Sequence, residues 1–382
     1  MHQVVTPADQ QQFLQVAIDI YKDDPQWIRP LDKDIEEVFD PAKNKFFKQG
    51  ECTRWLLKDD TGKVIGRIAS FINKKYKQEQ PTGGIGFFEC SNNPAAANFM
   101  FDHCKKWLEE RGMEAMDGPI NFGERERWWG LLVEGFSPPL YCLNYNPPYY
   151  QALFEQYGFQ LYFNQIIFGM GVDTQLTDKF VHRHAEIAAM PGYKAIRIQK
   201  NNLDKFAKDF TYIYNKAWAG HGGGKEIEER TVRKMFKSMK AAMDEDICWF
   251  TYYNEEPIAL WINLPDLNQF FKHFNGKFGL LQKLWFLWLK KFGKCDRFVG
   301  IVFGVIPEFQ GKGIDAFMVV EAAKIIQTNG RYKYYEMLWI GDFNPKMINI
   351  AESLGTQRNR RLITYRYLFD RSKEFVRHKM LN

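Results

Sequence analysis

The chain has 382 residues, more than one hydrophobic core usually serves, so two domains are expected. Apolar residues make up 45% and charged residues 26%, a composition typical of soluble globular proteins. The net charge is only +6, with lysines and arginines scattered among acids, which argues against a nucleic-acid partner.

Hydrophobic patterning and turn signals predict one α/β unit in the first 172 residues. A helix begins at Thr6, which can cap it, and Asp59–Gly62 joins two strands into a hairpin. A third strand leads into a long helix that Gly112 ends. The predicted strands lie at 52–58, 63–73, 84–90, 114–117 and up to about 169, and the later helices at 94–111 and 147–157.

A partly helical connector at 173–192 precedes a second unit, residues 193–382, in which the same order of elements recurs. Asn146-Pro147 precedes a helix that Gly158 ends, and Asn344-Pro345 precedes one that Gly355 ends. We infer an internal duplication, the alternative being coincidence between two ordinary α/β units. The predicted strands are 193–199, 247–253, 257–264, 298–306, 334–340 and 362–369, and the helices 203–218, 227–243, 279–292, 313–328 and 345–354.

The segment from Val305 to Asp315 lies between a predicted strand and a long helix. Its glycines let backbone N–H groups point into a concavity, and the helix N-terminus adds partial positive charge, which together suit a pyrophosphate. The segment resembles the acyl-CoA loop of the GNAT (GCN5-related N-acyltransferase) family, Gln/Arg-x-x-Gly-x-Gly/Ala, with Gln310 and Gly313 matching. Asp315 departs from that pattern: it either repels the pyrophosphate or is a helix-start acid that points to solvent.

The resemblance covers most of residues 193–370 and implies a fold and an activity. The implied fold is α/β (α+β), with two tandem GNAT-like domains, each a mixed, mostly antiparallel sheet flanked by helices. Only the second has the CoA loop, because the equivalent segment 89–97 lacks glycine. The implied activity is acyl transfer from acetyl-CoA or another acyl-CoA to an amine on a small molecule or peptide, without a metal.

The resemblance also implies roles for individual residues. Glu336 is the candidate base, with Glu308 as a weaker one, and either carboxylate is alternatively only solvated or paired. The candidate acids for the thiolate are Tyr365 and Tyr367. The candidate cofactor-binding residues are Val305, Gln310, Gly311, Lys312, Gly313 and Asn344.

The loop Gly118–Gly130 mixes charge, glycine and paired tryptophans, as functional loops do. With the segments around 130–136 and 145–150 it looks like a family of uncharacterised bacterial GNAT-related proteins. We expect it to line a substrate cleft that faces Glu336 and Tyr367, unless its charges form surface ion pairs and its tryptophans fill an interface. The candidate substrate-binding residues are Glu124, Arg125, Arg127, Trp128, Trp129 and Tyr149.

The stretch Lys277–Lys294 combines leucines and tryptophans with five lysines. Its apolar residues run nearly all round a helix, so we expect a buried helix, the alternatives being a membrane-surface helix or an acyl-chain site. The six cysteines form no CxxC or Cys/His cluster, so no zinc site is expected. Without a signal peptide or a long uncharged run, the chain is expected to be cytoplasmic, with no transmembrane segment.

Three functions remain open from the sequence. The first is the N-acyltransferase described above. The second is a tandem GNAT-like protein that has lost acyl transfer and binds a ligand or a partner, which Asp315 and the glycine-free segment 89–97 favour. The third resembles the tandem transferases that use aminoacyl-tRNA, against which the weak basic balance argues. The acceptor and the oligomeric state are not determined by the sequence.

Overall fold

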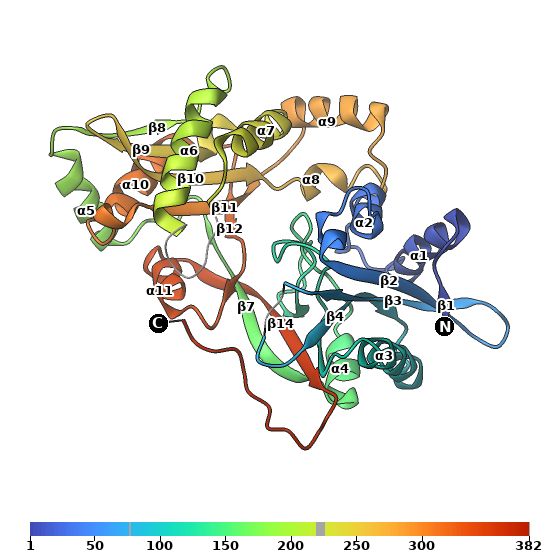
Figure 1. Ribbon diagram of the computed structural model, residues 1–382. Helices are drawn as coiled ribbons and strands as arrows, with labels where there is room; N and C mark the ends of the chain where they lie inside the picture. Colours follow the sequence, from blue (N-terminus) through green and yellow to red (C-terminus); the bar gives the residue numbers. More distant parts are fainter. Residues whose placement is uncertain (76–77, 219–225, 382) are drawn as a thin grey trace.

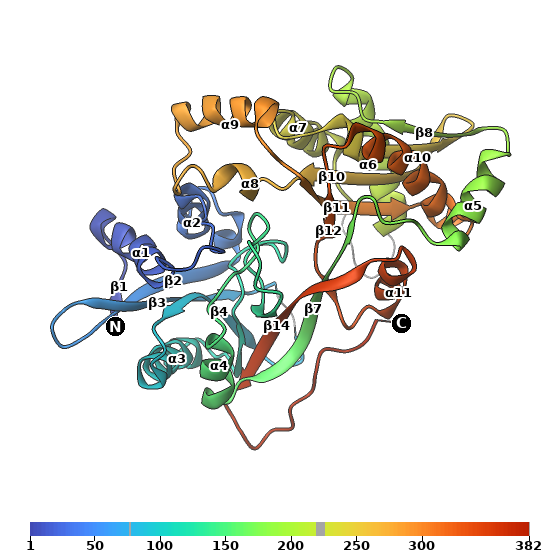
Figure 2. The same ribbon diagram turned by 180° about the vertical axis from the view of Figure 1, so that it is seen from behind.

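The structure is a computed structural model that describes residues 1–75, 78–218 and 226–381. Its helices and strands follow the predicted order closely (Figures 1 and 2). In residues 1–172, the N-terminal half, the elements are β1 (His2–Gln3), α1 (Pro7–Ile20), α2 (Asp32–Phe39), β2 (Gly50–Lys58), β3 (Val64–Asn73), β4 (Thr82–Cys90), α3 (Pro94–Glu109), β5 (Ala115–Gly118), β6 (Leu131–Glu134), α4 (Tyr150–Tyr157) and β7 (Gln160–Gly171).

The connector contains α5 (Asp178–Ala188), and residues 193–382 form the C-terminal half. Its elements are β8 (Tyr193–Arg197), α6 (Leu203–Trp218), α7 (Glu229–Met239), β9 (Cys248–Tyr253), β10 (Glu256–Pro265), α8 (Asn268–Phe271), α9 (Leu280–Phe292), β11 (Arg297–Val305), α10 (Ile314–Asn329), β12 (Tyr334–Met337), β13 (Ile340–Gly341), α11 (Pro345–Ser353) and β14 (Gln357–Leu368).

All strands belong to one continuous sheet, in the order β1-β2-β3-β4-β5-β14-β7-β12-β11-β10-β9-β8. Each half contributes an antiparallel hairpin and a parallel pair, β4 with β5 and β11 with β12. The last strand of each half lies against the other half: β14 pairs with β5, and β7 pairs with β12. The predicted fold class is confirmed, whereas the predicted boundary at 173–192 stays a prediction, since the sheet runs across it.

Local signals in the sequence account for several element ends. Thr6 and Asp9 form a capping box at the start of α1, as the Thr6 prediction required. Gly158 ends α4 in the left-handed region, with φ of 108°, where a residue with a side chain would be strained. The two Asn-Pro pairs differ in use: Asn344 caps α11 through the Met347 N–H, whereas Asn146 is buried and bonds both backbone groups of Leu132.

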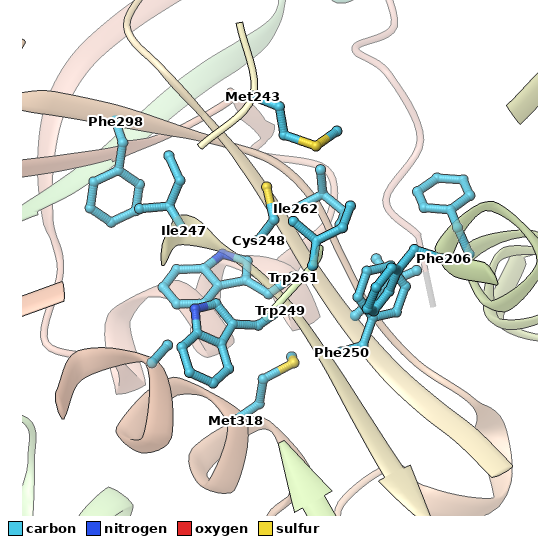
Figure 3. Packing of buried hydrophobic residues seen from close by; sticks show 14 of the residues in the cluster. Phe206, Met243, Ile247, Cys248, Trp249, Phe250, Trp261, Ile262, Phe298 and Met318 are labelled. Carbon is cyan, nitrogen blue, oxygen red and sulfur yellow. The ribbon is translucent and has the colours of Figure 1, made fainter. Parts of the chain in front are cut away.

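The larger core lies in the C-terminal half, where both faces of β9 and β10 are covered (Figure 3). Alternate residues of β9 point to opposite faces, so Phe250 packs on Phe206 of α6 with ring centroids 5.1 Å apart, while Trp249 lies on the side of Met318 from α10. Burial on both faces explains why these strands read as continuous apolar runs. This packing fixes the strands that border the candidate site.

Candidate functional site

The parallel strands β11 and β12 separate partway along their length. They pair from Arg297 with Tyr334 to Gly300 with Met337, and the Leu338 N–H still reaches the Gly300 carbonyl at 3.1 Å. Beyond that point β11 continues to Val305 and pairs with β10 only, while the segment after β12 turns away and forms β13, which pairs with β7. An opening therefore lies between the two strands at their carboxyl ends.

An apolar cavity of about 360 Å³ occupies this opening. Its walls are the separated strand ends, the start of α10, one side of α11 and two aromatic residues of α6. The lining residues include Tyr214, Trp218, Ile301, Phe303, Val319, Met337, Trp339, Met347 and Ile350. Among the described lining residues, Asp315 alone has a carboxylate or an amino group, and most of the others are apolar, so the cavity suits a hydrocarbon group.

The predicted acyl-CoA loop follows β11 directly and borders the start of α10. Gly311 and Gly313 have φ of 73° and 84°, which glycine adopts without strain. A Cβ atom at Gly311 would meet only open space, so this stretch of backbone is accessible. The Gln310 side chain donates to the Val305 carbonyl at 3.0 Å and braces the loop from within.

Two acids lie near this loop. Asp315, the second residue of α10, is half-buried and lines the apolar cavity. Glu308 is exposed and pairs with Lys216 at 3.4 Å. Its pKa is lowered, mainly by a hydrogen bond from its own backbone N–H and also by Lys216. Of the other predicted cofactor residues, Lys312 is exposed, with its ammonium 5.4 Å from the Phe309 ring, and Asn344 caps α11.

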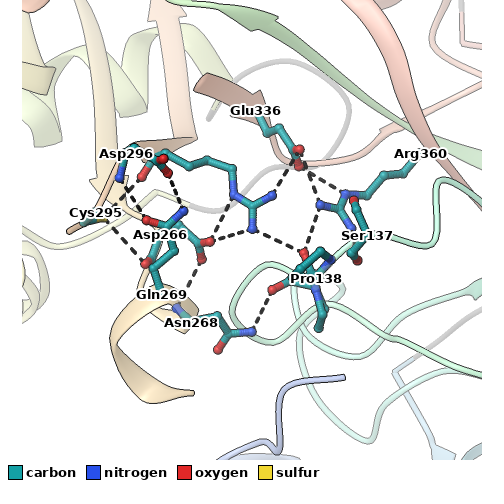
Figure 4. A network of polar contacts seen from close by, with 11 residues as sticks. Ser137, Pro138, Asp266, Asn268, Gln269, Cys295, Asp296, Glu336 and Arg360 are labelled. Atoms are coloured by element: carbon teal, nitrogen blue, oxygen red, sulfur yellow. Dashed lines mark hydrogen bonds and ion pairs between the residues drawn. The ribbon is translucent and has the colours of Figure 1, made fainter. Parts of the chain in front are cut away.

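Glu336 lies at the centre of a charged network between the two halves (Figure 4). Its carboxylate accepts from Arg360, which is fully buried, at 3.2 Å, and from Arg297 at 3.4 Å. Both arginines also donate to the Pro138 carbonyl of the N-terminal half, and Arg297 pairs with Asp266 at 2.7 Å. Both oxygens of Glu336 are thus engaged in joining the halves.

A second, larger cavity of about 890 Å³ lies beside this network, on the other side of β12. It is lined by groups from both halves, including Trp27, Pro138, His273, Asp296, Arg297, Tyr334 and Glu336. Tyr335 and Met170 line both cavities. The Tyr335 hydroxyl accepts from the Trp261 indole N–H at 3.3 Å, and burial raises its pKa. Tyr335 therefore stands between an apolar and a charged compartment, a position that the sequence did not single out.

Tyr365 and Tyr367 lie away from both cavities. Tyr365 pairs with Leu161 on β7, whereas Glu336 pairs with Gly169 of the same strand. These two positions on β7 are eight residues apart, which is roughly 26 Å along the strand. The Tyr365 hydroxyl donates to Glu155 at 2.8 Å, and Tyr367 packs on Tyr157. The structure thus does not bring the predicted acids to the predicted base or to the loop.

The loop Gly118–Gly130 contacts the C-terminal half at several points, from the pairing of Gly118 with Tyr365 of β14 to a contact at the apolar cavity. The indole N–H of Trp339, which lines the apolar cavity, donates to the Arg125 carbonyl at 3.1 Å. Trp128 and Trp129 are buried, and Glu124 pairs with Lys45 at 2.6 Å, while Arg127 is exposed. None of these loop residues is among the described residues that line the two cavities.

Trp128 lines a third cavity, of about 80 Å³, inside the N-terminal half. The buried Glu89 borders it, accepting from the hydroxyls of Tyr21 and Tyr150 at 2.9 Å and from Arg67 at 3.2 Å. Burial raises the pKa of Glu89, although the contacts with Arg67 and the two tyrosines lower it. Tyr149, also predicted for substrate binding, donates to the Cys90 carbonyl at 2.8 Å beside this cluster.

Comparisons with known proteins agree with this architecture. No protein-family model matches the chain. It is 28% identical over 366 residues to the bacterial ceramide synthase of Caulobacter vibrioides, covering 92% of this chain and 93% of that protein. It is 26% identical over 369 residues to protein YghO of Escherichia coli, covering 94% and 92%.

Two solved structures share the fold at low sequence identity. A tandem GNAT protein from the clavulanic acid biosynthesis pathway superposes with a TM-score of 0.54 at 9% identity, over 97% of this chain and 99% of that one. The GCN5-related glucosamine N-acetyltransferase region of a fungal β-N-acetylglucosaminidase gives 0.52 at 12% identity, over 96% and 37%. The chain therefore has the tandem GNAT fold.

Proposed function

We propose that this protein is an acyl-CoA-dependent N-acyltransferase that joins a fatty acyl group to the amine of a long-chain base. The observation that carries the proposal is the apolar cavity of about 360 Å³ at the point where β11 and β12 separate, next to the glycine loop. The similarity to a bacterial ceramide synthase supports the same substrate class, since a ceramide is the amide of a fatty acid with a long-chain base.

In this proposal the loop Gln310–Gly313 holds the pyrophosphate of acyl-CoA through backbone N–H groups and the start of α10. The pantetheine arm enters between the separated strands, and the acyl chain fills the apolar cavity. The amine nitrogen attacks the thioester carbonyl carbon, an N–C bond forms, and the C–S bond breaks. The amine loses one proton, and the departing CoA thiolate takes one up.

Tyr335 is the proposed proton donor to the thiolate. It lines the acyl cavity and the charged cavity alike, and its phenol carries a proton at neutral pH, as an ordinary tyrosine does. Because Trp261 donates to the hydroxyl oxygen, the phenol hydrogen is left for the sulfur. General acid catalysis contributes ~10²–10⁴-fold to a rate, so Tyr335→Phe should lower kcat by at least about 100-fold.

The amine acceptor is proposed to enter the charged cavity, where two groups are candidates for its deprotonation. The Glu336 carboxylate is held by two arginines, whereas burial and Lys272 lower the pKa of the His273 imidazole, which favours the neutral form that can accept a proton. If His273 is the base, His273→Gln removes the acidic limb of the pH–rate profile, and a Glu336→Gln variant keeps it.

A direct test is acyl transfer from palmitoyl-CoA to sphinganine, followed by release of free CoA thiol and by mass spectrometry of the amide. Tyr335→Phe is compared with Tyr367→Phe, a tyrosine that lies away from both cavities and whose variant should retain activity. Absence of any amide from the parent protein, with all long-chain amines tried, would contradict the proposal.

A second function is favoured by Asp315, which lines the cavity where an anionic cofactor would approach. In that case the protein binds an apolar ligand without transferring an acyl group. Calorimetric titration separates the two functions: measurable binding of CoA supports the transferase, and binding of a free fatty acid without any binding of CoA supports the second function.

A further inference from the structure

The helix α9 presents an apolar surface to solvent, contrary to the expectation of a buried helix. Of its side chains only Phe286 and Leu289 are buried. Its other large apolar residues are between 44% and 77% exposed. They are Leu280, Leu281, Leu284, Trp285, Leu287, Trp288 and Phe292. In both views the helix lies at the outer edge of the C-terminal half (Figures 1 and 2).

The buried side of α9 holds the helix firmly in this orientation. The Phe286 ring packs edge-on against Phe270 of α8, with centroids 5.4 Å apart. The Lys290 ammonium turns inward and donates to the Met243 carbonyl at 2.6 Å. Arg331 donates to the Lys290 carbonyl at 3.2 Å. The helix is therefore anchored by one face, and its apolar face points outward as part of the folded state.

The segment of the chain that contains this face carries charge of one sign. Between Asp266 and Asp296 the chain contains six lysines and no acid. Lys290 is turned inward, and the other five are exposed: Lys272, Lys277, Lys283, Lys291 and Lys294. An apolar face with tryptophans and bordering lysines is the pattern of helices that lie in the headgroup region of an anionic membrane.

We propose that α9 docks the protein on the surface of a membrane that contains anionic lipids. The helix has 13 residues and is about 20 Å long, too short for a hydrocarbon core of about 30 Å, so it lies in the plane of the interface. No helix in the described part of the chain is long and apolar enough to cross a membrane.

A second copy of the chain fits this face less well than a lipid surface does. A symmetric contact through α9 would bring the same lysines from both copies together, without an acid on the helix to balance them. Anionic headgroups supply the missing negative charge, and acyl chains accept the leucines and tryptophans. The inference concerns the surface alone and does not depend on the proposed acyl transfer.

The test uses the full chain and sedimentation with vesicles of phosphatidylcholine, with or without phosphatidylglycerol. The parent should bind the mixed vesicles, with a blue shift of tryptophan fluorescence. Leu284→Glu/Trp288→Glu should weaken binding by at least tenfold. Lys283→Gln/Lys291→Gln should weaken it by about tenfold or more on the anionic vesicles only.

The matched control is Phe99→Glu/Val181→Glu, which places the same charges on exposed apolar residues of α3 and α5 and should bind like the parent. Circular dichroism checks that all variants are folded. Failure of the parent to bind either vesicle, or equal loss in the control, would overturn the proposal. So would a dimer in light scattering that Leu284→Glu/Trp288→Glu dissolves, because a second copy would then be the occupant. No acyl donor or amine is present, so failure here leaves the proposed transferase activity untouched.

Discussion

The size of the apolar cavity should set the length of acyl chain that the protein accepts. A water molecule in the liquid fills about 30 Å³ and a methylene group is of similar size, so a cavity of about 360 Å³ has room for roughly a dozen methylene groups. Each methylene removed from water contributes ~0.8 kcal/mol, or about fourfold in binding. The value of kcat/KM should therefore rise along a series from acetyl-CoA to a long-chain acyl-CoA and then level off.

The substitution Met347→Trp tests where that limit lies. Met347 lines the cavity from α11 and is only half-buried, so a larger side chain is tolerated on the helix while its ring takes up part of the cavity. We expect the preferred chain to shorten by about two carbons or more, with about a fourfold loss for each methylene that no longer fits. Activity with acetyl-CoA should change little, because the short acyl group does not reach the ring.

The assay is release of CoA thiol over the acyl-CoA series at a fixed amine concentration. Met190→Trp, at an exposed methionine that is not among the residues lining the cavity, is the matched control and should keep the parent's preference. A parent protein with no dependence on chain length, or a Met347→Trp variant with an unchanged preference, would refute the assignment of the cavity to the acyl chain.

Three further regions give measurable expectations. In the loop, Gly313→Glu should abolish CoA binding in calorimetry, whereas Gly313→Asn should keep the affinity within a few fold, because asparagine tolerates the left-handed backbone. Asp315→Asn should tighten CoA binding by about threefold to tenfold, and an unchanged affinity would mean that the carboxylate does not face the pyrophosphate. Arg360→Met leaves Glu336 short of a partner and should lower the free energy of unfolding in urea by ~3–5 kcal/mol, while Arg358→Met, which removes an exposed ion pair, should cost less than about 1 kcal/mol. Because the pKa of Glu89 is raised, the folded protein binds one more proton than the unfolded chain between the ordinary glutamate pKa, about 4.3, and the raised value, and its free energy of unfolding falls as pH rises through that window. Glu89→Gln should flatten this slope by up to ~1.4 kcal/mol per pH unit. Parallel pH profiles of the free energy of unfolding for the parent and the variant would show that the pKa is not raised.

Much of the local structure followed from the sequence. The helices and most strands lie where the periodicities of 3.6 and 2 place them, because these periods and the capping residues act over a few neighbouring positions. The loop from Val305 to Gly313 was identifiable for the same reason, since its two glycines adopt the positive φ that such a turn requires. The tandem GNAT fold was expected from the resemblance of this loop and the elements around it to the GNAT family, together with the repeated order of elements in the two halves.

Other features depended on contacts between residues far apart in the chain. Periodicity shows that a strand is buried but not which strand it pairs with, so the exchange of β7 and β14 between the halves was not predicted. That exchange carries Tyr365 away from the loop that it follows in sequence, and it lets Arg360 of β14 reach Glu336 of β12. The position of Tyr335 between two cavities likewise arises only when both halves are assembled.

The helix α9 shows the same division most simply. Its composition established a helix rich in leucine, tryptophan and lysine, and an apolar surface nearly all round it suggested burial. The sequence showed that this helix needs apolar surroundings, but it did not show whether protein or lipid supplies them. Tertiary packing decided that one side, with Phe286 and Leu289, meets the protein and the other side meets solvent, because the available core surface beside α8 accommodates only one face of the helix.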